Sequence, residues 1–147
     1  MTRLLVHDLK QVASPGAEVL ENAFVLCDGD RIAGVGPMSR APRVRGDEEL
    51  DGSDLCAIPG LVDCHTHPAW GGDRVHEFSL RAAGASYEEL HAAGGGILST
   101  VRATRALAEE ELRSRVEEHA WWMLEHGTTT WEGKSGYGLD RDTELAS

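Results

Sequence analysis

Short apolar runs alternate with polar turns over the first part of the chain. Runs at 4–6, 23–27 and 31–35 have the length and composition of short β-strands. The second and third runs are separated by Asp28-Gly29-Asp30, and an Asp-Gly pair supplies the positive φ that a tight turn requires. The pattern therefore predicts a β-hairpin between these two strands.

A polar and charged stretch from Pro42 to Asp54 predicts a loop, and the apolar run that follows it ends at a Pro59-Gly60 turn. Beyond this turn the pattern changes from short strands to alternating strand and helix. The change divides the chain into a strand-rich part, residues 1–60, and a mixed part, residues 61–147.

The mixed part begins with Leu61-Val62-Asp63-Cys64-His65, a short run after a turn that predicts a buried parallel strand. Ser86 and Glu89 have the S-x-x-E spacing of a capping box, and apolar residues recur with helical spacing between 97 and 124. Gly127 marks a helix end, and the β-branched run 128–131 predicts the next strand. Successive βα units of this kind indicate an α/β fold with a parallel sheet.

Composition and charge exclude several classes of function. Apolar residues make up 41% of the chain and charged residues 27%, as in ordinary globular domains. The formal net charge of −11 leaves no basic patch for nucleic acid. No run of about 18 uncharged apolar residues is present, and the N-terminal apolar run is too short for a signal peptide. We therefore expect a cytoplasmic protein with no nucleic-acid or membrane partner.

Cys27, Cys56 and Cys64 are an odd number of cysteines without C-x-x-C spacing. This pattern favours free thiols over disulfides or a thiolate zinc site. We expect them to be small buried apolar side chains.

His65-Thr66-His67 is the strongest candidate for chemistry. On a strand, side chains at i and i+2 point to the same face, so both imidazoles can bind one metal ion at about 2.0 to 2.1 Å. The pair follows a predicted parallel strand, and active sites of α/β barrels form at the C-terminal ends of such strands. The histidines without paired ligand spacing, interpreted as structural or surface residues, are His76, His91, His119 and His126.

The run Pro59-Gly60-Leu61-Val62-Asp63-Cys64-His65-Thr66-His67 resembles the first-strand motif of the amidohydrolase superfamily. Segments 71–74, 94–101 and 134–139 together resemble the imidazolonepropionase family within it, and the likeness extends over essentially the whole chain. It implies a small β-sandwich portion over residues 1–60. Residues 61–147 would then be the start of a metal-dependent (β/α)8 barrel, truncated after its first two βα units.

The resemblance also implies a reaction. Members of the family use one zinc or iron ion to open the ring of 4-imidazolone-5-propanoate, giving N-formimino-L-glutamate in histidine degradation. His65 and His67 match the first metal ligands, and Arg74 and Tyr137 match the substrate-binding Arg and Tyr. A planar guanidinium suits a propionate carboxylate because it can donate two parallel hydrogen bonds. Without the resemblance, Arg74 would be interpreted as a solvated surface residue and Tyr137 as a loop aromatic.

The family's remaining metal ligands and its general base arise on later barrel strands. The catalytic residues are therefore unknown here, and we expect the 147 residues alone to be inactive. Lys134 follows the second predicted strand, so an ion pair or a loop contact is preferred to a bridging metal ligand, and Glu132 matches no metal-binding role. The glycine triplet 94–96 lacks a phosphate-binding motif, which favours a turn with close backbone packing.

Some positions depart from the family pattern in what would be the pocket wall, namely Pro68, Trp70, Trp131 and Gly133. Substrate identity is therefore more open than metal dependence. Two alternatives remain. One is another cyclic-amide hydrolase or deaminase that shares the metal motif. The other is a non-catalytic fragment whose sheet edges pair with a second copy to form a homo-oligomer.

Overall fold

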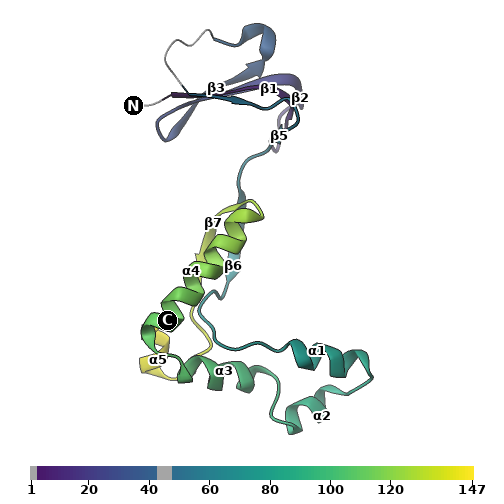
Figure 1. Cartoon of the computed structure of the whole chain (residues 1–147), viewed down its shortest axis with the longest axis vertical. Helices are drawn as coiled ribbons and strands as arrows, with labels where there is room; N and C mark the ends of the chain where they lie inside the picture. The colour runs from purple at the N-terminus through teal and green to yellow at the C-terminus, as the bar shows by residue number, and fades with distance from the viewer. Residues whose placement is uncertain (1–2, 43–47) are drawn as a thin grey trace. The chain divides into compact units, whose positions relative to one another are not determined.

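A computed structural model describes residues 3–42 and 48–147 of the chain. The chain divides into two compact units, Met1–Pro59 and Gly60–Ser147, each described here by itself. Figure 1 labels most of the elements of both units. Over the described ranges, no helix combines the length and apolar character needed to cross a bilayer.

The first unit contains one mixed β-sheet. Its elements are β1 (Arg3–Val12), β2 (Leu20–Asp28), β3 (Arg31–Pro37), the 3-10 helix η1 (Met38–Arg40), β4 (Glu48–Asp51) and β5 (Cys56–Ala57). The strand order is β3-β2-β1-β4, and β5 also pairs with β1. Strand β2 is antiparallel to both β1 and β3, whereas β4 and β5 run parallel to β1.

The predicted hairpin between β2 and β3 is confirmed. Asp28 pairs with Arg31 across the turn, and Gly29 within it has a φ of +60°. Phe24 and Leu26 lie two residues apart on β2 and share one face, where they form the core of the unit with Leu5. Met38 and Ala41 pack against this cluster.

The prediction of a loop from Pro42 to Asp54 is wrong for residues 48–51, which form β4. All four side chains of β4 are exposed, so the strand has no apolar alternation from which it could be predicted. Its backbone instead pairs with β1 over Leu4–His7. Residues 43–47 of the predicted loop lie outside the described residues.

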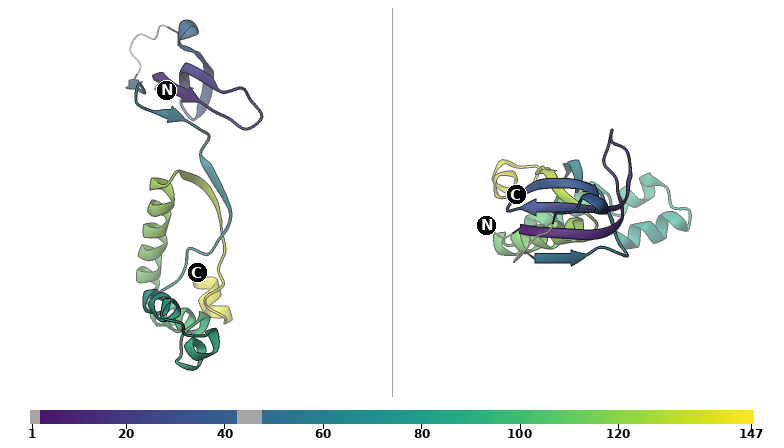
Figure 2. Two further views of the ribbon diagram at one scale, coloured as in Figure 1. Left: turned by 90° about the vertical axis from the view of Figure 1, so that its right-hand side faces the viewer. Right: turned by 90° about the horizontal axis from the view of Figure 1, so that it is seen from above.

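The second unit has the predicted order of strand, helices and strand (Figure 2). Its elements are β6 (Leu61–Thr66), α1 (Val75–Ala82), α2 (Tyr87–Ala92), α3 (Ile97–Ala106), α4 (Glu109–Glu125), β7 (Thr128–Gly133) and α5 (Arg141–Ala146). Strands β6 and β7 pair in parallel, and α4 lies along β7. This parallel arrangement directs the carboxyl ends of both strands, and the loops that follow them, to the same edge.

Two predicted helix ends are confirmed. Ser86 caps α2 through a full capping box, because its hydroxyl accepts from the Glu89 amide at 3.2 Å and the Glu89 carboxylate accepts from the Ser86 amide at 2.8 Å. Gly127 ends α4 with a φ of +91°. Helices α1 and α5 were not predicted, although Asp140 caps α5 by accepting a hydrogen bond from the Thr143 amide at 2.9 Å.

Two predictions of burial are wrong. Strand β6 is exposed along most of its length, with Leu61 at 49% and Val62 at 68% relative exposure. Among the described residues β7 is its only strand partner, so much of its apolar surface stays uncovered. The three cysteines are free thiols as expected, but Cys56 and Cys64 are exposed and Cys27 is half-buried. Cys56 lies on the short strand β5 and Cys64 on the uncovered β6.

Candidate metal and substrate site

His65 and His67 lie at the carboxyl end of β6, which ends at Thr66. Their Nε2 atoms are 3.3 Å apart, and their ring centroids are 5.2 Å apart. Two neighbouring ligands of a tetrahedral zinc site, each about 2.0 to 2.1 Å from the ion, are about 3.3 to 3.4 Å from each other. The two nitrogens therefore have a spacing that fits ligands of one ion.

The second nitrogen of His67 adds to this picture. Its Nδ1 is buried and has no hydrogen-bond partner among the described residues. Gly136 lies directly against this ring, since a Cβ at that position would be 2.9 Å from Nδ1. An ion held through both Nε2 atoms would not occupy this Nδ1, so the fit to a metal rests on the Nε2 spacing. Imidazole nitrogens are donors that suit zinc and iron.

The pair alone does not complete a catalytic metal site, which normally has three protein ligands and one open position. Over residues 3–42 and 48–147, one group of at least three His, Cys, Asp or Glu side chains gathers within metal-binding range, and it does not contain the histidine pair. That group is His7, Asp8 and Asp51 in the first unit. Among the described residues, no third side chain of these types joins the pair.

The carboxyl end of β7 carries an ion pair. Lys134 Nζ donates to Glu132 Oε1 at 2.8 Å. This agrees with the expectation that Lys134 forms an ion pair or a loop contact. This hydrogen bond is the main reason that the pKa of Glu132 is lowered, and the nearby His65 also contributes. The Lys134 backbone amide donates to the Thr66 carbonyl at 2.8 Å, which joins the two strand ends.

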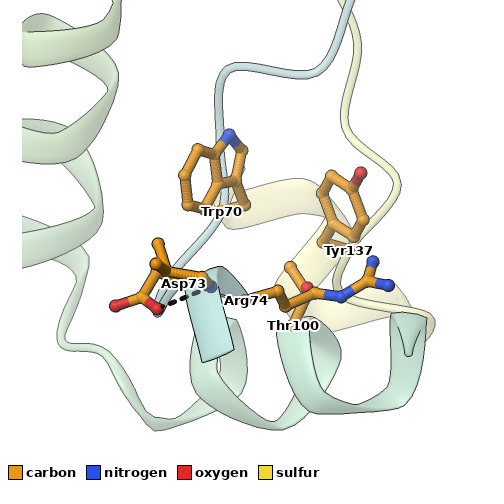
Figure 3. Close-up of a pocket in the computed structure, with 6 residues that line it drawn as sticks. Trp70, Asp73, Arg74, Thr100 and Tyr137 are labelled. Atoms are coloured by element: carbon orange, nitrogen blue, oxygen red, sulfur yellow. Dashed lines mark hydrogen bonds between the residues drawn. The ribbon is translucent and has the colours of Figure 1, made fainter. Parts of the chain in front are cut away.

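A cavity of about 430 Å³ lies between the loops that follow β6 and β7 (Figure 3). It is lined by Trp70, Asp73, Arg74, Val75, Thr100 and Tyr137. These residues come from the β6–α1 loop, the start of α1, α3 and the β7–α5 loop. Figure 3 shows the indole, the guanidinium and the phenol arranged around the same space. The structure thus places Arg74 and Tyr137, the two predicted substrate residues, in one cavity.

Tyr137 also connects the cavity to the histidine pair. Its ring lies edge-on to the ring of His67, with centroids 5.7 Å apart. All four residues singled out from the sequence therefore belong to one continuous region, which has imidazole nitrogens at one end and a guanidinium at the other.

Arg74 is held by Glu77, which the sequence analysis did not single out. Arg74 Nε and Nη2 are each 2.9 Å from Glu77 Oε2, and Glu77 Oε1 accepts from the Gly96 amide at 2.9 Å. The hydrogen bond with Arg74 is the main cause that lowers the pKa of Glu77, and the same contact raises the pKa of Arg74. Both groups therefore stay ionised near neutral pH.

Two helices, α3 and α4, hold the loop that carries Trp70 and Arg74 in place. On α3, the buried Thr104 hydroxyl accepts from the Gly71 amide at 3.0 Å. On α4, the buried His119 bonds the Pro68 carbonyl through Nδ1 at 2.7 Å and stacks on Trp70 with ring centroids 4.5 Å apart. The interpretation of His119 as structural is consistent with these contacts, which support the cavity wall.

Helix α3 holds the other loop as well. Arg105 Nε donates to the Gly138 carbonyl at 2.6 Å and is 2.9 Å from Asp140 Oδ2. One helix therefore supports the segments on both sides of the cavity, the one before α1 through Thr104 and the one after β7 through Arg105.

Comparison with known proteins identifies the relatives of this chain. No family profile matches it. It is 54% identical to imidazolonepropionase from Rubrobacter xylanophilus over 98% of its own length, and 50% identical to imidazolonepropionase from Caulobacter vibrioides over 90%. The chain is a relative of the imidazolonepropionases. It spans 39% of the length of the first protein and 33% of the second.

Solved structures share the fold of this chain. A Xaa-Pro dipeptidase with bound methionine matches 94% of the chain at a TM-score of 0.62 and 17% identity, and the match covers 28% of that protein. A mutant of atrazine chlorohydrolase from Arthrobacter aurescens, complexed with zinc and atraton, matches 90% at 0.62 and 20% identity, and the match covers 29% of that protein. At such identities the matches establish only the fold.

Sequence reasoning did not indicate which residues support the candidate site. Thr104 and His119 contact partners 33 and 51 positions away, so no local pattern indicates them. Glu77 did have a local signal, since it lies three residues after Arg74 at the start of a helix, a spacing that permits an ion pair.

Proposed function

We propose that this chain supplies the first two metal ligands and the carboxylate-binding residues of an imidazolonepropionase. Such an enzyme hydrolyses 4-imidazolone-5-propanoate to N-formimino-L-glutamate. The observation that carries the proposal is the position of Tyr137, whose ring contacts His67 and also lines the cavity that contains Arg74. A substrate in this cavity could reach both a metal ion on the histidines and a cation for its tail.

His65 and His67 would hold one zinc or iron ion through their Nε2 atoms, which are 3.3 Å apart. When bound, such an ion lowers the pKa of a coordinated water toward neutrality and polarises the carbonyl of a cyclic amide. The chain shares its fold class with a zinc-containing atrazine chlorohydrolase structure, which supports a metal requirement. Imidazole nitrogens coordinate both zinc and iron, so the proposal includes either metal.

Arg74 would bind the propionate carboxylate. Its side chain is 43% exposed and lines the cavity, so the N–H groups that Glu77 does not occupy can donate to a ligand. Tyr137 would donate or accept a hydrogen bond near the ring of the substrate, and Trp70 would form an apolar wall. These contacts would orient the substrate and exclude part of the water from the cavity.

The reaction adds one water molecule across a C–N bond of the ring. The water oxygen bonds to the carbonyl carbon, the C–N bond breaks, and the released nitrogen takes up a proton. Proton transfer requires a general base, which we assign to a segment of the full enzyme beyond these residues, together with the remaining metal ligands. The chain's own residues would bind and orient the substrate.

The fold of the complete enzyme is part of the proposal. The β6–α–β7 segment would begin a (β/α)8 barrel, whose active site forms at the carboxyl ends of its strands. The sheet of residues 1–60 would form part of a small β-sandwich, and the enzyme would act in the cytoplasm on a small molecule. The histidine pair at the carboxyl end of β6 and the cavity between the loops after β6 and β7 support this assignment.

The test is the metal content of a full-length imidazolonepropionase that carries this segment. We expect about one zinc or iron ion per chain in the wild type, and almost none when His65 and His67 are both replaced by Ala. His126→Ala is the matched control, because His126 lies at the far end of α4 and bonds the Trp122 carbonyl. Equal metal content in the double mutant and the control would refute the assignment.

A further inference from the structure

Glu77 is a buried carboxylate in the first turn of α1, with 3% relative exposure. Burying a charge is unfavourable unless the charge is paired and hydrogen-bonded, and here both oxygens are used. Oε2 accepts from Arg74, and Oε1 accepts from the Gly96 amide. Three N–H groups from two segments therefore converge on one carboxylate.

The contact determines how the Arg74 guanidinium is held. Nε and Nη2 are both 2.9 Å from the same Glu77 oxygen, and a guanidinium is planar, so two contacts on one edge limit rotation of the whole group. The Nη1 edge and one hydrogen of Nη2 remain for another partner. Because Arg74 lines the cavity, these donors are available to a ligand there.

The glycine turn before α3 is built to receive Glu77. A Cβ at Gly95 would lie 2.8 Å from Glu77 Oε1 and 2.9 Å from the Leu90 carbonyl oxygen, so a side chain there would displace the carboxylate. Gly96 has a φ of +74° and directs its amide at the same oxygen. The Gly94–Gly96 turn, which has no phosphate-binding motif, thus binds the Glu77 carboxylate through the Gly96 amide.

Asp73 provides a carboxylate in the lining of this cavity. Its carboxylate accepts from the Val75 amide at 3.1 Å, and its side chain lines the same cavity as the guanidinium.

We propose that Glu77, held by the Gly94–Gly96 turn, is a positioning residue that fixes the Arg74 guanidinium for substrates with a carboxylate tail. The inference rests on the proposed function and extends it to specificity. Electrostatics alone makes the opposite prediction, since removing a negative charge beside Arg74 would strengthen its attraction for a substrate carboxylate. The two effects therefore change KM in opposite directions.

The substitution Glu77→Gln, made in a full-length imidazolonepropionase that carries this segment, separates the positioning effect from the electrostatic effect. An amide offers only one acceptor oxygen, so its NH2 must face one of the three N–H donors and either Arg74 or Gly96 loses its partner. We expect KM for 4-imidazolone-5-propanoate to rise about tenfold, with kcat within about twofold of wild type. For an analogue whose tail carboxylate is replaced by a neutral amide, KM should not change.

The matched control is Glu118→Gln. Glu118 pairs with Arg115 at 3.2 Å and the same i,i+3 spacing, but both side chains are about half exposed and lie on α4. We expect wild-type KM for this control. Partial misfolding of Glu77→Gln would lower the concentration of active enzyme and hence the apparent kcat, whereas KM would still report on the folded fraction.

Each outcome supports or overturns the inference. An unchanged or lowered KM in Glu77→Gln, with an active wild type, overturns the positioning role and leaves the proposed function intact. A wild type that does not turn over the substrate overturns the proposed function and the inference with it. If Glu77→Gln does not fold, Glu77→Asp decides, because its shorter side chain cannot reach both partners. A raised KM in Glu77→Asp supports positioning, and a wild-type KM overturns it.

Discussion

Thr104 is the residue on which the cavity loop depends most directly, and Thr104→Val tests that dependence. The side chain is 2% exposed, accepts from the Gly71 amide at 3.0 Å, and donates to the Thr100 carbonyl at 2.8 Å. Valine has nearly the same shape, so the substitution removes both hydrogen bonds without opening a cavity. Gly71 itself is tightly packed, because a Cβ at that position would lie 2.7 Å from Leu107.

The expected loss follows from these contacts. Leaving a buried donor unsatisfied costs about 1 to 3 kcal/mol, and the lost back-bond to Thr100 adds little, since Thr100 keeps its place in the helix. With a urea dependence of about 1 to 3 kcal/mol per molar, the midpoint of unfolding should fall by roughly 1 M. Tryptophan fluorescence is the appropriate probe, because all four tryptophans lie in the second unit.

Ser114→Ala is the control for this substitution. Ser114 makes the same type of back-bond, donating to the Glu110 carbonyl at 3.0 Å, but it is exposed on α4 and holds no second segment. Its removal should change the free energy of unfolding by less than about 0.5 kcal/mol. If Thr104→Val and Ser114→Ala shift the midpoint equally, Thr104 does not anchor the loop and the reasoning fails.

Three further predictions follow. In the full-length enzyme, Arg74→Lys should raise KM for 4-imidazolone-5-propanoate about tenfold, since an ammonium group cannot donate as a planar fork, whereas Arg115→Lys should not; steady-state kinetics would show whether the two differ. Folding lowers the pKa of Glu77, Asp140 and Glu144 below their ordinary values, so stability should be full above about pH 5 and decline as the pH falls through the lowered pKa values. Urea midpoints from pH 6 to 3 would reveal this decline, and a flat profile would contradict it. The 147-residue chain by itself should not hydrolyse the substrate above background and should self-associate, because it supplies two histidine ligands and leaves Val62 and Trp121 68% and 62% exposed. Metal-dependent turnover by this chain, or a monomer in light scattering, would contradict the respective half of this prediction.

The parts of the fold that could be predicted are those with local causes. Asp28-Gly29 forms a hairpin because the turn itself needs a positive φ, and Ser86 starts a helix because its partner is three residues away. Strand β4 could not be predicted, since its side chains are all exposed and only pairing with β1 makes it a strand. The burial of β6 was overestimated because an apolar run does not reveal how many neighbours will cover it.

The candidate site divides in the same way. The spacing of His65 and His67 on a strand is visible in the sequence, and their Nε2 atoms do approach each other. Arg74 and Tyr137 were singled out by resemblance, since nothing in the spacing of two residues on different loops indicates a shared cavity. Thr104 and His119 depend on contacts that only the folded chain creates, which is why sequence patterns did not indicate their roles.

The central claim is that His65, His67 and Arg74 act together on one substrate. It is tested most directly by following the conversion of 4-imidazolone-5-propanoate to N-formimino-L-glutamate by a full-length enzyme that carries this segment. We predict metal-dependent turnover in the wild type, loss of kcat when His65 and His67 are replaced by Ala, and a raised KM with nearly unchanged kcat in Arg74→Lys. Turnover that persists without both histidines, or a wild type that leaves this substrate unchanged while hydrolysing or deaminating another cyclic amide, would contradict the account.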